Sequence, residues 1–529
     1  MQSKILLHNA RIYTQAADLV VDSMAINKNR IVAVGKNLRH DPDFKSYQRL
    51  DLKGRTVIPG LTDAHTHFFY HALMLSRVNV QGLDTLNACL EKIRRHARTL
   101  RKDEWVVGQG YAPDRFRTRI EPDRKQLDEV TGGRPAFIFS KDEHTAWVNT
   151  KALELAGITK RTKDPVGGAV VHFEDGTPSG ILREKPAFMS VYKLIPLPSQ
   201  RTINKCYRLA LDDAYRKGIT AVHSFDDTIG TFERFSELAV NNKVGLRVNY
   251  YFPVDQLPQL KASKIYYGTG TEFFRVAGVK IFADGSLGSQ TALCFNKLIG
   301  TKDSFGIQVN VPKDIKRMAA VAARLGLPCA IHAIGDRAVA NVLDGLEDAR
   351  KLDFNARHRI EHLQLIRRKD IARLQSLGVV ASMQPSHCPS DIKMMRKYWG
   401  ARAANAFIFR SLLDRGIPLA FGSDAPIEPL DPIGGIAAAV RRAEGASRDI
   451  FYPEQRLTAR EALFGFTAGA AYAVGQEHCR GYLLPGYPAD YAILSQDICS
   501  VPATRIAQTE VLATVLDGKP KYCHASIRL

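Results

Sequence analysis

The sequence predicts an α/β protein: a (β/α)8 TIM barrel, a β-sandwich built from both chain ends, and a small domain inserted after barrel strand 1. Three observations support this fold class. Eight strand-like runs alternate with helix-like stretches through the middle of the chain. Histidine, lysine or aspartate stands at or near the end of five of these runs. Short alternating strand patterns occur near both chain ends.

The strand-like runs are short and apolar. They lie at 56–67, 219–224, 246–252, 276–283, 328–332, 359–362, 379–383 and 418–423. Helix-like stretches, such as 313–325 and 369–377, separate most of them. This alternation is typical of a (β/α)8 barrel, whose active site lies at the C-terminal ends of the strands.

The connection between the first two runs is too long for an ordinary βα loop. It contains strand-like runs of its own at 105–108, 136–139 and 169–173, so we expect an inserted α+β subdomain over residues 68–201. The strand patterns at the two chain ends could not bury a core alone, and together they predict a sandwich. The predicted boundaries are 1–55 and 476–529 for the sandwich and 56–475 for the barrel.

The most informative motif is a pair of histidines, His65 and His67, at the end of the first run. Residues i and i+2 of a strand share a face, so both imidazoles point to the same side. Imidazole is a common ligand of zinc and its neighbours. The pair alone could be two hydrogen-bonded strand histidines, but later runs deliver further candidate ligands: Lys280, His332, His362 and Asp424.

Several segments resemble the amidohydrolase superfamily, and within it the YtcJ-like amidohydrolase 3 group. The resemblance covers almost the whole chain in the right order. The matching segments are PGLTDAHTH at 59–67, DEHTAWVN at 142–149, VKIFADGSLGS at 279–289, HAIGDRA at 332–338, RIEH at 359–362, SMQP at 382–385, GSDAP at 422–426 and PGYPAD at 485–490.

The resemblance implies a centre of one or two divalent metal ions, with zinc preferred. His65 and His67 would bind the more buried ion, and His332 and His362 the more exposed one. Lys280 is similar to a lysine that carries CO₂ as a carbamate and bridges two ions; the alternatives are a plain lysine or a Lys280–Asp284 ion pair. His332 and His362 could instead be core histidines.

Asp424 would bind metal and act as general acid and base; it could also cap a helix before Ala425-Pro426. This implies hydrolysis of a non-peptide C–N bond, such as an amide or formamide, by metal-activated water. The candidate substrate-binding residues are Asp142, His144, Trp147, His223, Arg337 and Gln384. Trp147 could equally be core, and His144 and His223 could support other groups.

Three other functions remain open from the sequence. A mononuclear deaminase of a heterocycle would commonly have a glutamate close after the strand-5 histidine, and Ala333-Ile334-Gly335 follow His332 here. A catalytically inactive scaffold would lose ligands, whereas all six candidates are present. Nucleic-acid binding is suggested only by charge, since no binding motif accompanies it.

Composition sets the broad class. The chain has 529 residues, 45% hydrophobic and 24% charged, with a net charge of +20 that we interpret as solvated basic surface. Eight cysteines without paired spacing, and no secretory signal, predict a cytoplasmic protein. No apolar stretch is long enough for a membrane helix. We expect a small-molecule substrate, and a homodimer is left open.

Overall fold

The structure, a computed structural model, describes residues 4–17, 19–113, 116–117, 122–141, 145–165, 168–196, 198–226, 230–241, 243–353, 355–527 and 529. The chain divides into two compact units. One contains residues 1–69 and 211–529, and the other contains residues 70–210. The domain boundaries inferred from the sequence stay predictions.

Eight parallel strands of the larger unit form a nearly closed barrel, which confirms the predicted (β/α)8 fold. Their order is β8 (Leu61–Thr66), β15 (Ile219–Ser224), β16 (Arg247–Pro253), β17 (Phe274–Phe282), β18 (Cys329–Ala333), β19 (Arg359–His362), β20 (Val380–Met383) and β21 (Leu419–Phe421). The edge strands β8 and β21 join beyond their C-terminal ends. There the amide of Asp424 donates to the carbonyl of His65 at 2.7 Å, and the amide of His67 donates to the carbonyl of Ala425 at 2.9 Å.

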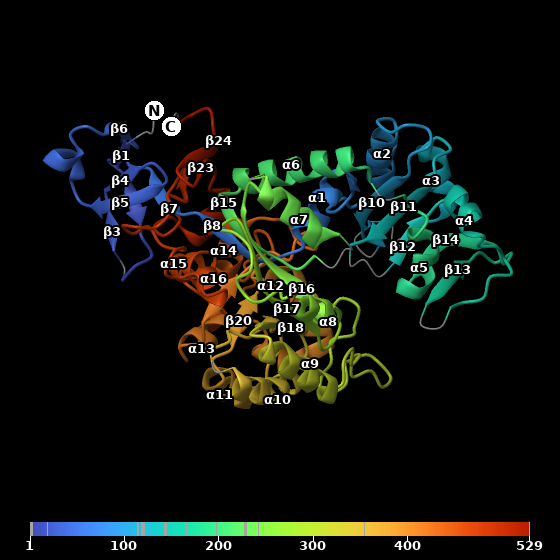
Figure 1. The fold of residues 1–529 in the computed structure, drawn as a ribbon. Coiled ribbons are helices and arrows are strands. Elements are labelled where there is room, and N and C mark those ends of the chain that lie inside the picture. The colour runs from blue at the N-terminus through green and yellow to red at the C-terminus, as the bar shows by residue number, and fades with distance from the viewer. Residues whose placement is uncertain are drawn as a thin grey trace. The chain divides into compact units, whose positions relative to one another are not determined.

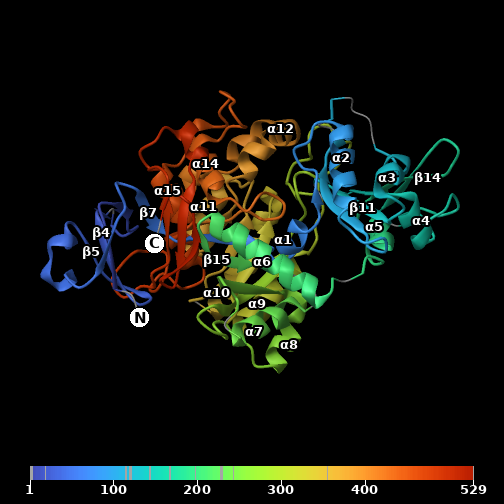
Figure 2. The same cartoon turned by 90° about the horizontal axis from the view of Figure 1, so that it is seen from above.

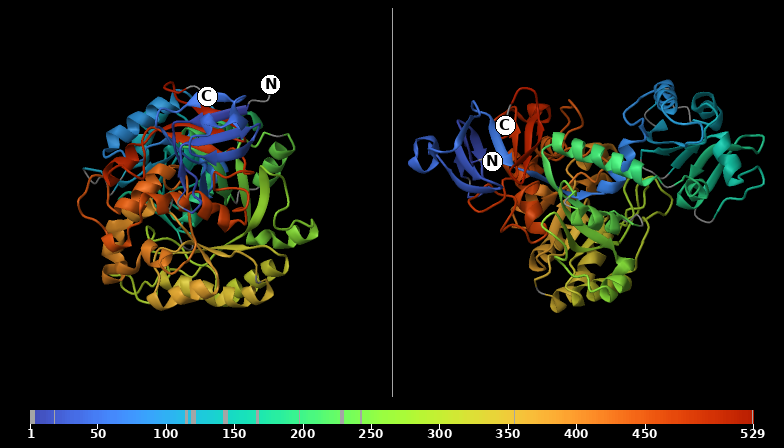
Figure 3. Two further views of the ribbon diagram at one scale, coloured as in Figure 1. Left: turned by 90° about the vertical axis from the view of Figure 1, so that its left-hand side faces the viewer. Right: turned by 45° about the horizontal axis from the view of Figure 1, so that its top comes forward.

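Helices follow the barrel strands and cover their outer side. α9 is typical, because its buried residues Ile315, Ala319, Ala322 and Ala323 recur at helical spacing and form one apolar face. Figures 1 and 3 show α9, α10 and α11 side by side along the outside of the strands. The helices are α7 (Thr231–Val240), α8 (Leu257–Ala262), α9 (Pro312–Arg324), α10 (Asp336–Leu352), α11 (Arg368–Ser376), α12 (His387–Trp399), α13 (Phe409–Leu413), α14 (Pro432–Arg441), α15 (Ala459–Gly465) and α16 (Ala468–Ala473).

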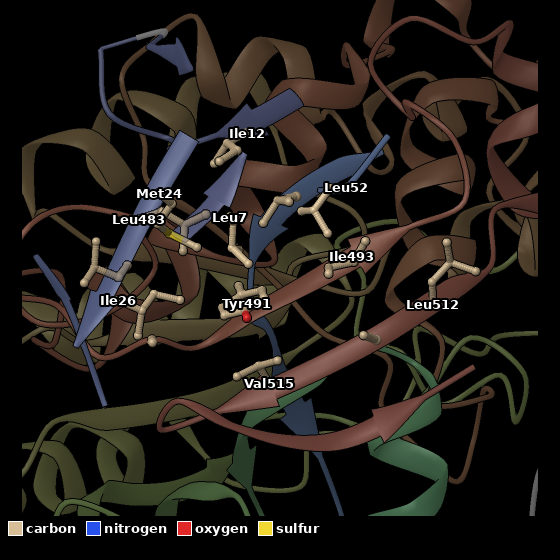
Figure 4. Packing of buried hydrophobic residues seen from close by; sticks show 14 of the residues in the cluster. Leu7, Ile12, Met24, Ile26, Leu52, Leu483, Tyr491, Ile493, Leu512 and Val515 are labelled. Atoms are coloured by element: carbon tan, nitrogen blue, oxygen red, sulfur yellow. The ribbon is translucent and has the colours of Figure 1, made fainter. Parts of the chain in front are cut away.

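Both chain ends contribute to a β-sandwich, as predicted. One sheet has the order β5 (Arg30–Gly35), β4 (Ser23–Asn27), β1 (Lys4–His8) and β6 (Gln48–Asp51). The other has the order β24 (Lys519–Cys523), β23 (Val511–Leu516), β22 (Tyr491–Leu494), β7 (Thr56–Pro59), β2 (Arg11–Tyr13) and β3 (Val20–Val21). Figure 2 shows β7 beside the C-terminal strands. Leu7, Met24, Ile493 and Val515 are among the buried residues that fill the space between the sheets (Figure 4).

The sequence predicted one strand over residues 56–67, and this was wrong in one respect. The run is divided at Gly60 into β7 of the sandwich and β8 of the barrel. The amide of Gly60 donates to the carbonyl of Asp490 at 2.9 Å. A Cβ at Gly60 would lie 2.3 Å from Oγ1 of Thr220, so only glycine lets the chain pass here.

The smaller unit contains a six-stranded mixed sheet. Its order is β13 (Ala169–His172), β14 (Pro178–Arg183), β12 (Thr145–Val148), β11 (Ala136–Ser140), β10 (Val106–Tyr111) and β9 (Val78–Asn79). All three runs predicted in this region are strands. The helices of this part of the chain are α1 (Phe68–Leu75), α2 (Leu86–Ala97), α3 (Arg124–Thr131), α4 (Thr150–Ala156), α5 (Lys185–Tyr192) and α6 (Gln200–Arg216).

Short 3₁₀ helices complete the described secondary structure: η1 (Leu38–His40), η2 (Pro42–Phe44), η4 (Val254–Gln256), η5 (Gly400–Asn405), η6 (Pro453–Gln455) and η7 (Ala503–Gln508). Among the described helices, none combines the length and the apolar character needed to cross a membrane. All eight cysteines are free thiols.

Candidate metal centre

The first group of candidate ligands lies where β8 and the segment after β21 meet. Nε2 of His65 lies 3.4 Å from Oδ1 of Asp424, and Nε2 of His67 lies 3.6 Å from the same oxygen. One ligand atom from each of these three residues lies within 4.8 Å of the others. His65 is buried, whereas the side chain of His67 is 26% exposed. The two histidines and the aspartate therefore converge as a possible ligand set.

A second group shares Asp424 and includes a residue that the sequence analysis missed. His387, the first residue of α12, has its Nε2 3.8 Å from Oδ2 of Asp424. Ligand atoms of His362, His387 and Asp424 also lie within 4.8 Å of one another. His362 is the last residue of β19, and its ring centroid lies 5.0 Å from that of His65. The two groups are thus neighbours.

Lys280 enters the same space from β17. Its Nζ lies 3.5 Å from Nε2 of His65. The amine also lies 4.7 Å from the ring centroid of Phe225 and 5.0 Å from that of Phe282. Only 5% of the lysine is exposed. These rings favour a cationic amine at this position, and a chemical modification would remove its positive charge.

His332 lies beside His362 but points one nitrogen elsewhere. The two ring centroids are 4.4 Å apart. Nε2 of His332 lies 3.0 Å from the carbonyl oxygen of Gly285 and 3.6 Å from Oδ1 of Asp284. Asp284 itself accepts hydrogen bonds from the backbone amides of Leu293, Ile334 and Gly335, at 2.9, 3.0 and 2.8 Å. This carboxylate thus secures the loop that precedes α10.

A buried polar network supports His65 from behind. Nδ1 of His65 lies 2.5 Å from Oε2 of Glu361. Nε of Arg359 donates to Oε1 of Glu361 at 2.5 Å, and the hydroxyl of Ser382 donates to Oε2 at 2.7 Å. Because the carboxylate accepts the Nδ1 proton, the Nε2 lone pair of His65 is directed toward Asp424 and Lys280. Glu361 and Arg359 therefore orient a candidate ligand, a role that the sequence analysis did not assign.

Burial keeps the central histidines neutral. Burial, followed by the charge of Lys280, lowers the pKa of His65 well below its usual range, and lowers the pKa of His332 to about 3. Burial and neighbouring His332 likewise hold the pKa of His362 well below its usual range. Neutral imidazole is the form that binds metal ions. At neutral pH these side chains are ready ligands.

The donor set fits a divalent metal ion. It combines neutral imidazole nitrogens with the carboxylate oxygens of Asp424, which is the chemistry that zinc and related ions accept. Within the described part of the chain, the buried Nδ1 of His362 has no hydrogen-bond partner. Buried polar atoms are seldom left in that condition, so a bound ion would account for this nitrogen.

The candidate substrate residues of the larger unit occupy different positions. His223 is fully buried, and its Nδ1 accepts from Arg359 at 2.8 Å, so it belongs to the network behind His65. Gln384 follows β20 and is 1% exposed; both polar atoms of its amide lack hydrogen-bond partners among the described residues. Arg337, the second residue of α10, is exposed.

The remaining candidates belong to the smaller unit. Trp147 is buried in its core, where the indole Nε1 donates to the carbonyl of Asp123 at 2.7 Å and the ring packs against Tyr111. Its surroundings are those of a core residue, one of the two alternatives that the sequence left open. Asp142 and His144 lie outside the described residues.

The chain is similar in sequence to known proteins over most of its length. The profile of the Amidohydrolase family matches residues 48–522. The "Putative amidohydrolase YtcJ" of Bacillus subtilis (strain 168) is 30% identical over 487 residues, covering 90% of this chain and 90% of that protein. The "N-substituted formamide deformylase" of Arthrobacter pascens is 26% identical over 534 residues, covering 98% of each.

A solved structure shares the fold over nearly the whole length. The crystal structure of an uncharacterized metal-dependent hydrolase from Pyrococcus horikoshii OT3 has a TM-score of 0.78 and 27% sequence identity. The similarity covers 95% of this chain and 99% of that chain. The fold is therefore shared with a metal-dependent hydrolase.

Proposed function

Because the chain belongs to the amidohydrolase family, we propose that it hydrolyses an amide or formamide-type C–N bond of a small molecule, with Asp424 as general acid and base. Family membership makes the chain a metal-dependent hydrolase of C–N bonds other than peptide bonds. One observation carries the finer proposal. The carboxylate of Asp424 lies 3.4, 3.6 and 3.8 Å from imidazole nitrogens of His65, His67 and His387.

We assign the metal ligands to the residues that the sequence predicted: His65, His67, Lys280, His332, His362 and Asp424. Zinc is our proposed ion, because nitrogen-rich sites completed by oxygen suit it. When bound, such an ion lowers the pKa of a water molecule to about 7 and polarises the substrate carbonyl. The rest of the chemistry belongs to side chains of this chain.

Asp424 would move the proton. Its carboxylate takes a proton from the attacking water and delivers it to the nitrogen that leaves, so that water and amide become a carboxylic acid, or formic acid, and an amine. The backbone fixes this group, since its amide donates to the carbonyl of His65 at 2.7 Å. A carboxylate held in one place can serve both transfers without reorganising.

We further propose that Lys280 carries a carbamate. Its neutral amine would attack CO₂ and lose one proton, which replaces a buried cation by an anion beside three imidazoles. The 5% exposure of Lys280 and the 3.5 Å distance to His65 support this proposal. The metal content of Lys280→Ala tests it: a fall from two ions to one or none supports the carbamate, and unchanged content contradicts it.

The substrate class rests on a relative and on one side chain. The relative from Arthrobacter pascens is named for N-substituted formamides. The buried amide of Gln384 can both donate and accept, which suits a formamide or amide group. We propose that Gln384 contacts the substrate. We also propose a reducing, cytoplasmic location, because all eight thiols are free.

A substrate panel tests the proposed function. Zinc-loaded protein is incubated with N-formyl and N-acyl amines of graded size, and release of formate or carboxylate is measured together with release of amine. Stoichiometric release that Asp424→Asn abolishes is the expected result. Release of ammonia from heterocycles alone would instead favour a deaminase, and loaded protein that turns over no member would contradict the proposal.

A further inference from the structure

We propose that His387 is a metal ligand, and that His362, His387 and Asp424 form a second metal position joined to the first through Asp424. This inference rests on the metal-dependent function proposed above. It adds a residue to the expected ligand set, because the sequence pointed only to His332 as the partner of His362. Four observations lead to it.

The first observation is the place of His387 in the barrel. It follows the C-terminal end of β20 after Gln384, Pro385 and Ser386, and it begins α12. The amide of His387 donates to the carbonyl of Gln384 at 3.1 Å, which fixes this first turn. The imidazole is therefore carried at the end of the barrel where active sites of this fold lie.

The second observation is the way in which Asp424 is shared. Its Oδ1 faces His65 and His67, at 3.4 and 3.6 Å, and its Oδ2 faces His387 at 3.8 Å. The two oxygens of one carboxylate thus serve different imidazoles. A carboxylate in this position can bridge two ions.

The third observation is spacing. One ligand atom each from His362, His387 and Asp424 lies within 4.8 Å of the others, the same limit that the first group meets. Donors about 2 Å from a tetrahedral zinc ion stand roughly 3.3 Å apart. Small side-chain movements would bring these atoms to that spacing. Two imidazoles and one carboxylate form a set that accepts zinc or cobalt.

The fourth observation concerns His332. Its Nε2 lies 3.0 Å from the carbonyl oxygen of Gly285, a contact that requires an N–H on this nitrogen. A neutral imidazole has a single N–H, so Nε2 cannot bind metal while it makes this bond. Within the described residues, His332 is in neither group of converging ligand atoms. The lone pair of His332 is then on Nδ1, so His332 keeps one nitrogen for a metal ion, and His387 adds a converging donor beside His362.

Counting bound ions tests this inference without any substrate. The full-length protein is stripped with a chelator and dialysed against zinc or cobalt in the presence of bicarbonate. Bound metal is then measured together with the visible spectrum of the cobalt form. The variants are His387→Gln, His387→Glu and, as a control on an exposed histidine, His478→Gln. Thermal unfolding of each metal-free variant reports whether it is folded.

We expect two ions in the wild type and in His478→Gln, and one ion in His387→Gln. The affinity for the second ion should fall by at least about 100-fold, more than the roughly 10–100-fold typical of losing an outer partner of a ligand. His387→Glu should recover the second ion, because a carboxylate of similar reach replaces the nitrogen. A residue that only supported the fold would not be rescued in this way.

Two ions with unchanged affinity in His387→Gln would overturn the inference and leave the proposed function intact. One ion in both the wild type and His387→Gln would also overturn it, and would indicate a mononuclear enzyme. No ion in the wild type would overturn the metal-dependent function itself. The failure of the inference is therefore distinguishable from the failure of the function.

Discussion

The two ends of the barrel both bury ionisable side chains, but in opposite ways. At the start of β16, Arg247 is fully buried and its guanidinium meets carboxylates of Asp490, Glu272 and Asp517, at 2.6, 2.9 and 3.5 Å. At the C-terminal end, several imidazoles gather around Asp424. One end pairs opposite charges, whereas the other collects groups that bind a cation.

Two buried histidines show the same contrast. Burial lowers the pKa of His358, which precedes β19, to about 4, and lowers the pKa of His332, in the second half of β18, to about 3. Nδ1 of His358 accepts from the amide of Cys329 at the start of β18. Similar burial thus serves strand alignment at one end and a candidate metal centre at the other. The burial of a histidine alone therefore does not indicate its role, whereas the groups that it contacts do.

The largest expected effect comes from a substitution at the C-terminal end of the barrel, where the candidate metal ligands lie. Asp424→Asn keeps the shape of the side chain but can neither take up nor return a proton. We expect turnover to fall by about 10²–10⁴-fold, the usual contribution of general acid–base catalysis. The free energy of unfolding of the metal-free protein should change little. Steady-state kinetics on a substrate found in the panel measures this, with exposed Asp414→Asn as the control.

The second effect comes from a substitution at the opposite end of the barrel, where Arg247 pairs with carboxylates. Arg247→Met removes a buried cation and leaves Asp490 without its main partner, which should cost about 3–5 kcal/mol in the free energy of unfolding. Urea unfolding measures the loss, and the folded protein should keep its metal content. As a control, Arg396→Met removes an exposed pair with Asp449 and should cost at most about 1 kcal/mol. If folded Arg247→Met lost its metal, this would contradict the separation of roles between the two ends of the barrel.

A third change sharpens the comparison, because it acts on the support of a ligand and not on the ligand itself. Glu361→Gln replaces the carboxylate that accepts the Nδ1 proton of His65. Metal affinity should fall by roughly 10–100-fold, as for other partners of ligating histidines. Competition with a chromogenic chelator measures the affinity. Ser382→Ala, which removes one hydrogen bond to Glu361, should have a smaller effect.

The smallest effect is a pH dependence of the free energy of unfolding, which His358 should cause. The folded-state pKa of His358 is about 4, below the ordinary value of 6.5. Its contribution to stability is therefore complete above pH 6.5 and is lost as pH falls toward 4, at about 1 kcal/mol per pH unit. Unfolding of metal-free protein between pH 4 and 8 should show this slope, and His358→Gln should flatten it. A slope unchanged in the variant would mean that other groups cause it.

Most of the fold could be predicted, because the hydrophobic periodicity and the lengths of the apolar runs indicate its helices and strands. The barrel strands read as apolar runs that are buried on both faces, and α9 and α11 appear one residue from their predicted bounds. The division at Gly60 could not be predicted in the same way. The residues directly on either side of it, Pro59 and Leu61, are apolar, and only the approach of Thr220 in space makes the break necessary.

The candidate site was predictable where a strand carries the residue. The five runs that carry histidine, aspartate or lysine at or near their ends led to the six candidate ligands, whose assignment stays a prediction. His387 was missed because it begins a helix after a proline, so no strand pattern marks it. Arg359 and Glu361 did leave a signal, since charges at i and i+2 within a buried strand must face the same interior and pair there.

The single-glycine junction between β7 and β8 also has a consequence for how the chain folds during synthesis. β7 pairs with β22, so Thr56 lies opposite Leu494, and the sheet that anchors the first ligand strand needs residues translated much later. Pairings so distant along the chain form slowly. β7 can therefore pair early only with β2, and in ribosome-bound chains that end before residue 491 it should lack its second neighbour, β22.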